Sequence, residues 1–404
     1  MRSEPPTGDE LTRLLTSMKR NVLERVAQEP APAKRMSVRR MFGIGLGVAA
    51  LFGVGAGAAF ALGVMSAPQE ETATATTDAP SARPTASAPI EYAVTAGQPA
   101  SRYGLDCGTV VDPTLVSGLF TTAVAAVDPI VSESGVGIAI PRRSAILAVG
   151  GTVCEWSNGV AMNDQYGVEP DYVGVTIAVV PRAAAGWSEH ATQHGMPAEE
   201  SQCDGGWCWA SSAVGDAWLT VSAYGGDELA VDETGWQTLV DAAAAAVGAT
   251  GPAAPPITPE RMTRPGPEDC DAVIPVDQVR SITGTPDAQA MTGSGGWSEW
   301  AEARLHADAW GCGWGVDDLS QAARVDWLHQ GRWAYLRMLH AGTSTPIQLA
   351  GLPSGDVASV RCDDRFGTTC AVDLAVGRDW YNVTANDEAT AIALAEALLA
   401  RLTS

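Results

Sequence analysis

CWASSAVGDAW at Cys208–Trp218 recurs 162 residues later as CAVDLAVGRDW at Cys370–Trp380. The two stretches share the first cysteine, a central Ala-Val-Gly and the final tryptophan. Ala-Val-Gly-x-x-Trp is typical of a strand, a turn and a second strand, with Gly215 and Gly377 in the turns. The match predicts two copies of one domain and says little about chemistry.

The cysteines support this duplication, because the eight of them divide four and four between the copies. Asp-Cys opens each copy, and a Cys-x-Trp triplet follows at residues 154–156 and 312–314. Four cysteines allow three pairings in each copy. Proximity and repeat symmetry favour four disulfides, two long and two short: Cys107–Cys154, Cys270–Cys312, Cys203–Cys208 and Cys362–Cys370. The sequence has no Cys-x-x-Cys spacing, so zinc binding is not favoured.

The repeats are expected at residues 101–249 and 269–404. A linker at 250–268 separates them, with six prolines in 19 residues. Each copy ends in an Ala-rich helix, expected at Thr234–Val247 and Ala389–Leu402, with Asp232 and Asp387 as N-caps.

Earlier in each copy a helix follows the first cysteine, expected at Pro113–Ala126 and Val276–Thr283. Alternating strands come next, and Trp333–Leu339 is expected among them. This order predicts an α+β fold, with each repeat an antiparallel sheet that carries helices on one face.

Residues 41–65 form an uncharged run of 25, enough for a helix to cross a bilayer. Arg39 and Arg40 precede the run, and no basic residue follows it until Arg83. The positive-inside rule therefore places the N-terminus in the cytoplasm and the repeats outside the cell. A cleaved signal peptide at residues 59–61 is the alternative, but the residues that follow remain apolar.

On either side of this predicted membrane helix lie a cytoplasmic segment, 1–40, and a tether, 66–100. Residues 7–28 have the periodicity of a short amphipathic helix, which could contact a membrane surface or a partner. In the tether Ala, Thr, Ser and Pro make up 24 of 35 positions, a composition that predicts disorder.

The Asp-Cys openings, the Cys-Glu-Trp and Cys-Gly-Trp triplets and the Gly-rich anchor together resemble actinobacterial cell-envelope proteins with membrane-anchored, disulfide-paired α+β ectodomains. Some sensor-kinase ectodomains are similar. The resemblance spans residues 40–404 and implies a location at the cell surface. It supplies no catalytic residues.

Charge excludes one large class of partner. The net charge is −22, and because residues 1–40 carry +4, the rest of the chain carries −26. Such a surface repels nucleic acid. No lysine occurs after Lys34, which excludes a phosphate-loop lysine or a Schiff-base lysine in the exported part.

No motif for catalysis or metal binding is complete. His190 and His194 have the spacing of a helical metal pair but lack the Glu of a zincin, and the second copy has no counterpart. The remaining histidines are His306, His329 and His340. The acidic pairs Glu199-Glu200, Asp317-Asp318 and Asp363-Asp364 are expected on the solvated surface. We therefore expect no catalytic residue, metal or cofactor.

Tryptophan is the other unusual feature, with 13 Trp against five Phe. Trp156, Trp218, Trp314 and Trp380 recur in both copies and are expected in the cores. The others are not clearly duplicated, and some could line a surface for a glycan or peptide. The candidates for that surface are Trp207, Trp209, Trp297, Trp300 and Trp333.

The sequence favours a ligand- or partner-binding or sensory module of the cell envelope, attached to the cell membrane by a single pass. Two alternatives remain open: an envelope hydrolase with a site in one repeat, and a scaffold of an envelope complex. The identity of the partner and the oligomeric state do not follow from the sequence.

Overall fold

The structure, a computed structural model, describes residues 97–134, 140–162, 169–181, 200–255, 270–291, 303–304, 306–316, 321–363 and 369–403. All of them belong to one compact unit, Ala82–Ser404. The predicted cytoplasmic segment, the predicted membrane helix and tether residues 66–96 lie outside them. Among the helices that the structure does describe, none has the length and apolar character needed to span a bilayer.

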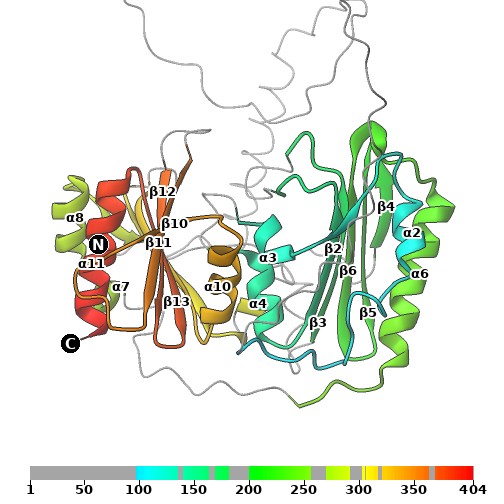
Figure 1. The fold of residues 1–404 in the computed structure, drawn as a ribbon, viewed down its shortest axis with the longest axis horizontal. Coiled ribbons are helices and arrows are strands. Elements are labelled where there is room, and N and C mark those ends of the chain that lie inside the picture. The colour runs from blue at the N-terminus through cyan, green and yellow to red at the C-terminus, as the bar shows by residue number, and fades with distance from the viewer. Residues whose placement is uncertain are drawn as a thin grey trace, which may run out of the picture. The chain divides into compact units, whose positions relative to one another are not determined.

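Repeat one folds around a six-stranded antiparallel sheet (Figure 1). The strand order is β1-β2-β3-β6-β5-β4. A tight turn joins β5 to β6 at Gly215, whose φ of 59° favours glycine. The strands are β1 Ala125–Val127, β2 Thr152–Ser157, β3 Gly174–Pro181, β4 Glu200–Asp204, β5 Trp207–Val214 and β6 Ala217–Tyr224.

Repeat two folds around a seven-stranded antiparallel sheet in the order β10-β11-β12-β13-β9-β8-β7. Read from β7, it repeats the order of the first sheet and adds β10 at the far edge, as a duplication predicts. Gly377 forms the β12–β13 turn with a φ of 61°. The strands are β7 Gln289–Met291, β8 Ala309–Gly315, β9 Gln321–Leu328, β10 Thr345–Ile347, β11 Val357–Asp363, β12 Thr369–Val376 and β13 Asp379–Ala385.

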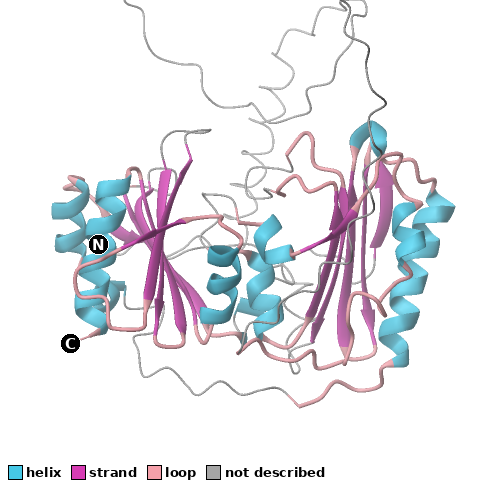
Figure 2. Ribbon diagram, in the orientation of Figure 1, coloured by secondary structure: helices cyan, strands magenta, loops and turns pink. Residues whose placement is uncertain are grey.

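Helices cover both faces of each sheet, which confirms the α+β class but corrects the prediction of helices on one face (Figure 2). All eight residues of β3 are buried, and a strand buried on both sides needs a layer on each. In repeat one α6 (Glu233–Ala249) and α2 (Pro113–Ser117) lie on one face, and α3 (Pro129–Ser132) and α4 (Arg142–Ala148) lie on the other. We call these the α6 face and the α4 face.

The seven-stranded sheet has the same arrangement. On one side lie α11 (Glu388–Leu402), α7 (Cys270–Val273) and α8 (Val276–Thr283). The other side is covered by α10 (Arg332–His340). We call these sides the α11 face and the α10 face.

The repeats share a hydrophobic core between the α4 face and the α10 face. Trp218 and Ile146 of repeat one belong to the same buried cluster as Leu328, Tyr335 and Trp380 of repeat two. The ring centroids of Tyr335 and Trp380 are 5.9 Å apart in a stacked arrangement. The four duplicated tryptophans are all buried, as predicted: Trp156, Trp218, Trp314 and Trp380.

The two closing helices begin at Glu233 and Glu388, one residue before the predicted starts and directly after the predicted N-caps. Asp232 accepts a hydrogen bond from the Gly235 amide at 2.8 Å, and Asp387 accepts one from the Thr390 amide at 2.9 Å. Each carboxylate satisfies a backbone donor that the first turn would otherwise leave unpaired.

Two predicted elements are wrong. The expected helix at Pro113–Ala126 ends after Ser117, and its last residues belong instead to strand β1. The expected strand at Trp333–Leu339 is the helix α10. Its aromatic residues favour strands in general, but here both faces of a short helix are buried, so no clear periodicity remains.

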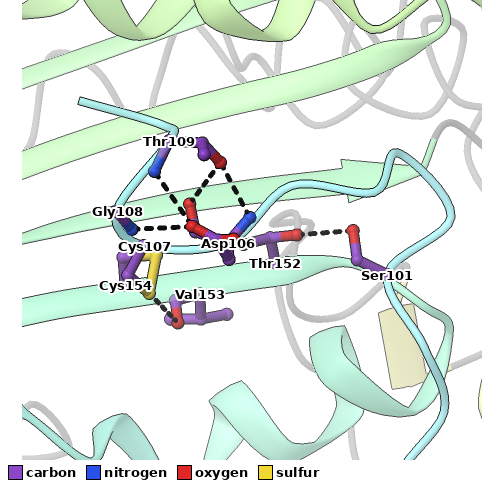
Figure 3. Close-up of a disulfide and its surroundings, with 8 residues drawn as sticks. All are labelled: Ser101, Asp106, Cys107, Gly108, Thr109, Thr152, Val153 and Cys154. Atoms are coloured by element: carbon purple, nitrogen blue, oxygen red, sulfur yellow. Dashed lines mark hydrogen bonds between the residues drawn. A yellow bond between two sulfur atoms is a disulfide. The ribbon is translucent and has the colours of Figure 1, made fainter.

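The cysteines form the four predicted disulfide pairs. The long pairs bring Cα atoms to 5.3 Å at Cys107–Cys154 and 5.6 Å at Cys270–Cys312, and both short pairs bring them to 4.1 Å. Figure 3 shows the first of these, where the turn after Asp106 presents Cys107 to β2. Asp106 holds that turn by accepting from the amides of Gly108 and Thr109.

Candidate functional site

The α4 face of repeat one carries a buried ion pair. Glu155 on β2 is fully buried, and Arg143 of α4 donates to its Oε2. Its Oε1 accepts from the hydroxyls of Ser132 at 2.6 Å and Tyr172 at 2.8 Å. Both oxygens are therefore satisfied, as a buried carboxylate requires.

Arg143 is held on several sides as well. It donates to Thr176 Oγ1 of β3 at 2.9 Å, and its backbone amide donates to Glu133 Oε2 at 2.9 Å. The charges of Arg143, Glu133 and Glu155 thus join α3 and α4 to the sheet.

Tyr172 connects this cluster to Tyr224. Burial raises the pKa of its hydroxyl, and the Glu155 carboxylate raises it further, so the phenol stays neutral and donates. A Cβ on Gly174 would lie 2.6 Å from the Tyr172 hydroxyl and 2.7 Å from the Trp156 carbonyl oxygen, which is too close, so the position favours glycine. The Tyr172 ring meets Tyr224 edge to face at 6.5 Å.

Trp207 and Trp209 lie on β5, beside Tyr224 of β6. They alternate with Cys208 and Ala210, which pack in the core of the α6 face, so they point to the α4 face. Trp207 pairs in register with Tyr224, and both tryptophans are half-buried. We call Trp207, Trp209 and Tyr224 the aromatic group.

The α10 face of repeat two carries a row of buried polar residues. Asp326 on β9, Asn382 on β13, Asp373 on β12 and Ser359 on β11 are successive register partners. Asp326 is 3% exposed and the other three are fully buried. Such a row is stable only if its members are hydrogen-bonded or paired with charge.

Arginines compensate both carboxylates of this row. Arg324 and Arg304 pair with Asp326, and Arg361 Nε lies 3.2 Å from Asp373 Oδ2. The Asp326 carboxylate raises the pKa of Arg324, whereas burial lowers that of Arg304. Asp373 also accepts from the Asn382 amide at 2.7 Å and from the Trp380 indole at 3.0 Å.

Two arginines of repeat two reach across to repeat one. Arg361 donates to the Ser134 carbonyl. Arg337 of α10 donates to Asp128, the N-cap of α3, at 2.7 Å, and to Gln98 at 3.0 Å. We call the Arg361–Ser134 and Arg337–Asp128 contacts between the repeats the seam; Gln98 lies three residues before repeat one. Together with the shared core, they connect the α4 face of one repeat to the α10 face of the other.

This arrangement favours a structural role for the buried carboxylates. Glu155, Asp326 and Asp373 each face an arginine, so their charges are already compensated within the fold. The half-buried aromatic group differs from them, because it offers flat, partly accessible rings.

The structure separates the five tryptophans proposed for a ligand surface. Trp207 and Trp209 lie together, half-buried. Trp297 and Trp300 fall outside the described residues. Trp333 is 2% exposed in the shared core, so it cannot line a surface.

The histidines and acidic pairs do not converge on a site in the described parts. His306 and His340 are exposed, and His329 Nδ1 lies 2.8 Å from Asp379 Oδ1. His190 and His194 fall outside the described residues. Each acidic pair does so at least in part. No three metal-binding side chains gather within the described ranges.

The buried charges were not expected from the sequence. Their signal was present, since Asp373 stands between Val372 and Leu374 in a strand that is otherwise apolar. A charge inside such a run marks a buried polar contact, but its partner comes from another strand and cannot be read locally.

The chain was compared with known protein families, curated proteins and solved structures, and nothing significantly similar was found in any of the three.

Proposed function

We propose that the two repeats form a non-enzymatic binding module of the cell envelope, which binds its ligand or partner through the aromatic group of repeat one. The proposal does not depend on the buried carboxylates, which are occupied by arginines.

The observation that carries the proposal is a difference between the repeats. Shifting by 162 residues places Thr369 and Ala371 at the positions of Trp207 and Trp209, and Asn386 at that of Tyr224. Repeat two therefore forms the same sheet without the aromatic side chains. Their presence in repeat one is not needed for the fold, and partly exposed aromatic rings bind ligands with little loss of side-chain entropy.

We further propose that residues 41–65 anchor the module in the cell membrane, with the N-terminus in the cytoplasm. The uncharged run and the arginines before it support this placement. Protease treatment of intact cells tests it: the repeats should be digested from outside, whereas residues 1–40 should stay protected. Protection of the repeats together with digestion of residues 1–40 would indicate the opposite orientation.

The test of binding uses the full chain, crosslinked in intact envelope. The variant Trp207→Thr/Trp209→Ala introduces the residues that repeat two carries at the same positions. We expect it to lose at least about tenfold of the crosslinked material, equivalent to about 1.4 kcal/mol of binding free energy.

Trp310→Ala is the matched control, because Trp310 is also half-buried but packs against the core of the α11 face. It should retain the crosslinked material. Equal retention by the Trp207→Thr/Trp209→Ala variant, with an unchanged thermal midpoint, would show that the aromatic group is not the binding surface.

A further inference from the structure

The disulfides of repeat two differ in how far solvent can reach their sulfurs. Cys270, Cys312 and Cys370 are at most 7% exposed, whereas Cys362 is exposed. Thiol–disulfide exchange begins when an external thiolate attacks one sulfur of the bond. Within repeat two, only Cys362 offers that access in the folded state.

The Cys362–Cys370 bond crosses between directly opposed positions of two paired strands. Its neighbours in the β11–β12 ladder are Arg361 opposite Ala371 and Asp363 opposite Thr369. Backbone pairing along the ladder keeps the two cysteines within reach of each other after the bond opens, while this end of the ladder loses its cross-link and gains freedom to move. The strands are thus able to present both sulfurs for closure again.

The residue next to Cys362 contributes to the seam. Successive side chains of a strand point to opposite faces, so Cys362 faces away from the side on which Arg361 lies. Arg361 pairs with Asp373 and donates to the Ser134 carbonyl of repeat one. The end of β11 therefore carries both an accessible disulfide and a contact between the repeats.

We propose that Cys362–Cys370 is a site of reversible thiol–disulfide exchange with a dithiol, and that its opening loosens the Arg361–Ser134 contact. This inference does not depend on the proposed binding function.

The exchange is a two-electron reduction of the protein. A thiolate of the dithiol attacks Cys362 Sγ, the protein disulfide breaks, and Cys370 leaves as a thiolate that takes up a proton. The second thiol of the reagent then attacks the mixed disulfide and releases Cys362 as a thiol. The dithiol is oxidised to a disulfide, and the reverse sequence closes the protein bond.

The first test treats the full chain with graded dithiothreitol under native conditions, traps free thiols with a maleimide, and maps each cysteine by mass spectrometry. With the maleimide added in denaturant, so that burial of a freed thiol does not limit labelling, we expect Cys362 and Cys370 to be found free at least about tenfold sooner than Cys270 and Cys312. Both sulfurs of the Cys270–Cys312 bond are buried and can be attacked only after local opening. Labelling of all four at one rate would overturn the proposal.

The second test measures hydrogen exchange in residues 129–134 once Cys362–Cys370 has been opened selectively. Exchange there should rise about tenfold or more, the change expected when a hydrogen bond to a charged group is lost. The variant Cys362→Ser/Cys370→Ser should give the same rise without reductant. Unchanged exchange in both samples would show that the disulfide does not influence the seam.

Cys203→Ser/Cys208→Ser is the matched control. It removes the equivalent cross-strand bridge of repeat one, next to the exposed residue Gln202. It should leave exchange in 129–134 at the level of the unmodified protein. A rise equal to that of the Cys362→Ser/Cys370→Ser variant would mean general loosening and would contradict a specific link through Arg361.

Discussion

Glu155 and Gly313 occupy the same place in their repeats, between the disulfide cysteine and the buried tryptophan of each Cys-x-Trp triplet. Repeat one fills the position with a carboxylate that pairs with Arg143. Repeat two leaves it without a side chain, and a Cβ there would collide with the Gln321 amide. The charged pair is therefore not a requirement of the fold but an addition to one copy.

Removing Glu155 should be costly, because Arg143 would keep its charge in a buried place without a partner. We expect Glu155→Ala to lower the free energy of unfolding by about 3–5 kcal/mol. Urea unfolding at neutral pH measures the change.

Asp277→Ala is the control for that measurement. Asp277 pairs with Arg280 on the surface and is 89% exposed, so its loss should cost less than about 1 kcal/mol. Equal costs for the two variants would mean that the buried pair contributes no more than a solvated one.

At the scale of single residues, the sequence predicted what repeats and missed what differs. Cysteines, turn glycines and core tryptophans recur in both copies, so comparing the copies identified them. Glu155 and Arg361 have no counterpart of the same kind in the other copy. Their contacts join distant strands and helices, and local pattern carries no information about such pairing.

The closing helices show how a single carboxylate sets the start of an element. Asp387 accepts from the Thr390 amide and hydroxyl, and these hydrogen bonds lower the pKa of its carboxyl below the ordinary 3.8. A lowered pKa in the folded state means that the ionised form is the stabilising one. Its contribution is complete above the ordinary pKa and is lost as the pH falls through the lowered value.

Asp387→Ala should lower the thermal midpoint at neutral pH, whereas Asp387→Asn should lower it less, because asparagine is also a good N-cap. The difference between the wild type and Asp387→Asn should shrink as the pH falls below 3.8. Thermal melts of all three proteins across that pH range provide the check. A difference that grows toward acid would mean that the ionised carboxylate does not stabilise the helix start.

Elements were predicted well where a boundary has a chemical marker. The Asp caps fixed the start of α6 and α11, and the turn glycines fixed the β5–β6 and β12–β13 hairpins. The faces of the sheets were predicted less well, since α3, α4 and α10 are short. Helix α10 places Trp333 and Tyr335 in the shared core. A buried strand and a buried helix there would have the same uninterrupted run of apolar residues, so the sequence pattern does not distinguish them.

Within the described residues, the two repeats contact each other through the shared core and through hydrogen bonds of Arg337 and Arg361. Arg337, whose side chain is 8% exposed, makes one of those contacts, to Asp128, and also donates to Gln98, three residues before repeat one. Arg332 lies on the same helix but bonds only within repeat two in the contacts described, to Asp356, Gly355 and Gly377. Comparing variants of the two arginines therefore distinguishes a contact between the repeats from contacts within repeat two.

Arg337→Met keeps most of the side-chain stem but removes the donors. We expect it to cost about 1.5–3 kcal/mol, the range for hydrogen bonds to charged groups, and to raise hydrogen exchange in α3. Arg332→Met should leave exchange in α3 unchanged. If both variants changed α3 equally, the seam would have to depend on the helix as a whole rather than on the Arg337 contacts.

Gln98 lies only three residues before Ser101, whose hydroxyl bonds Thr152 of β2 at 2.8 Å, and Arg102 then bonds the Gly150 carbonyl at 2.8 Å. Any mechanical load on the N-terminal segment therefore arrives first at the side chain that links α10 to α3. Traction along the chain would peel Gln98 from Arg337 before it could shear the ladder of β2. Within the described residues, a pull from the N-terminal side would thus reach a contact with α10 before it reached any strand.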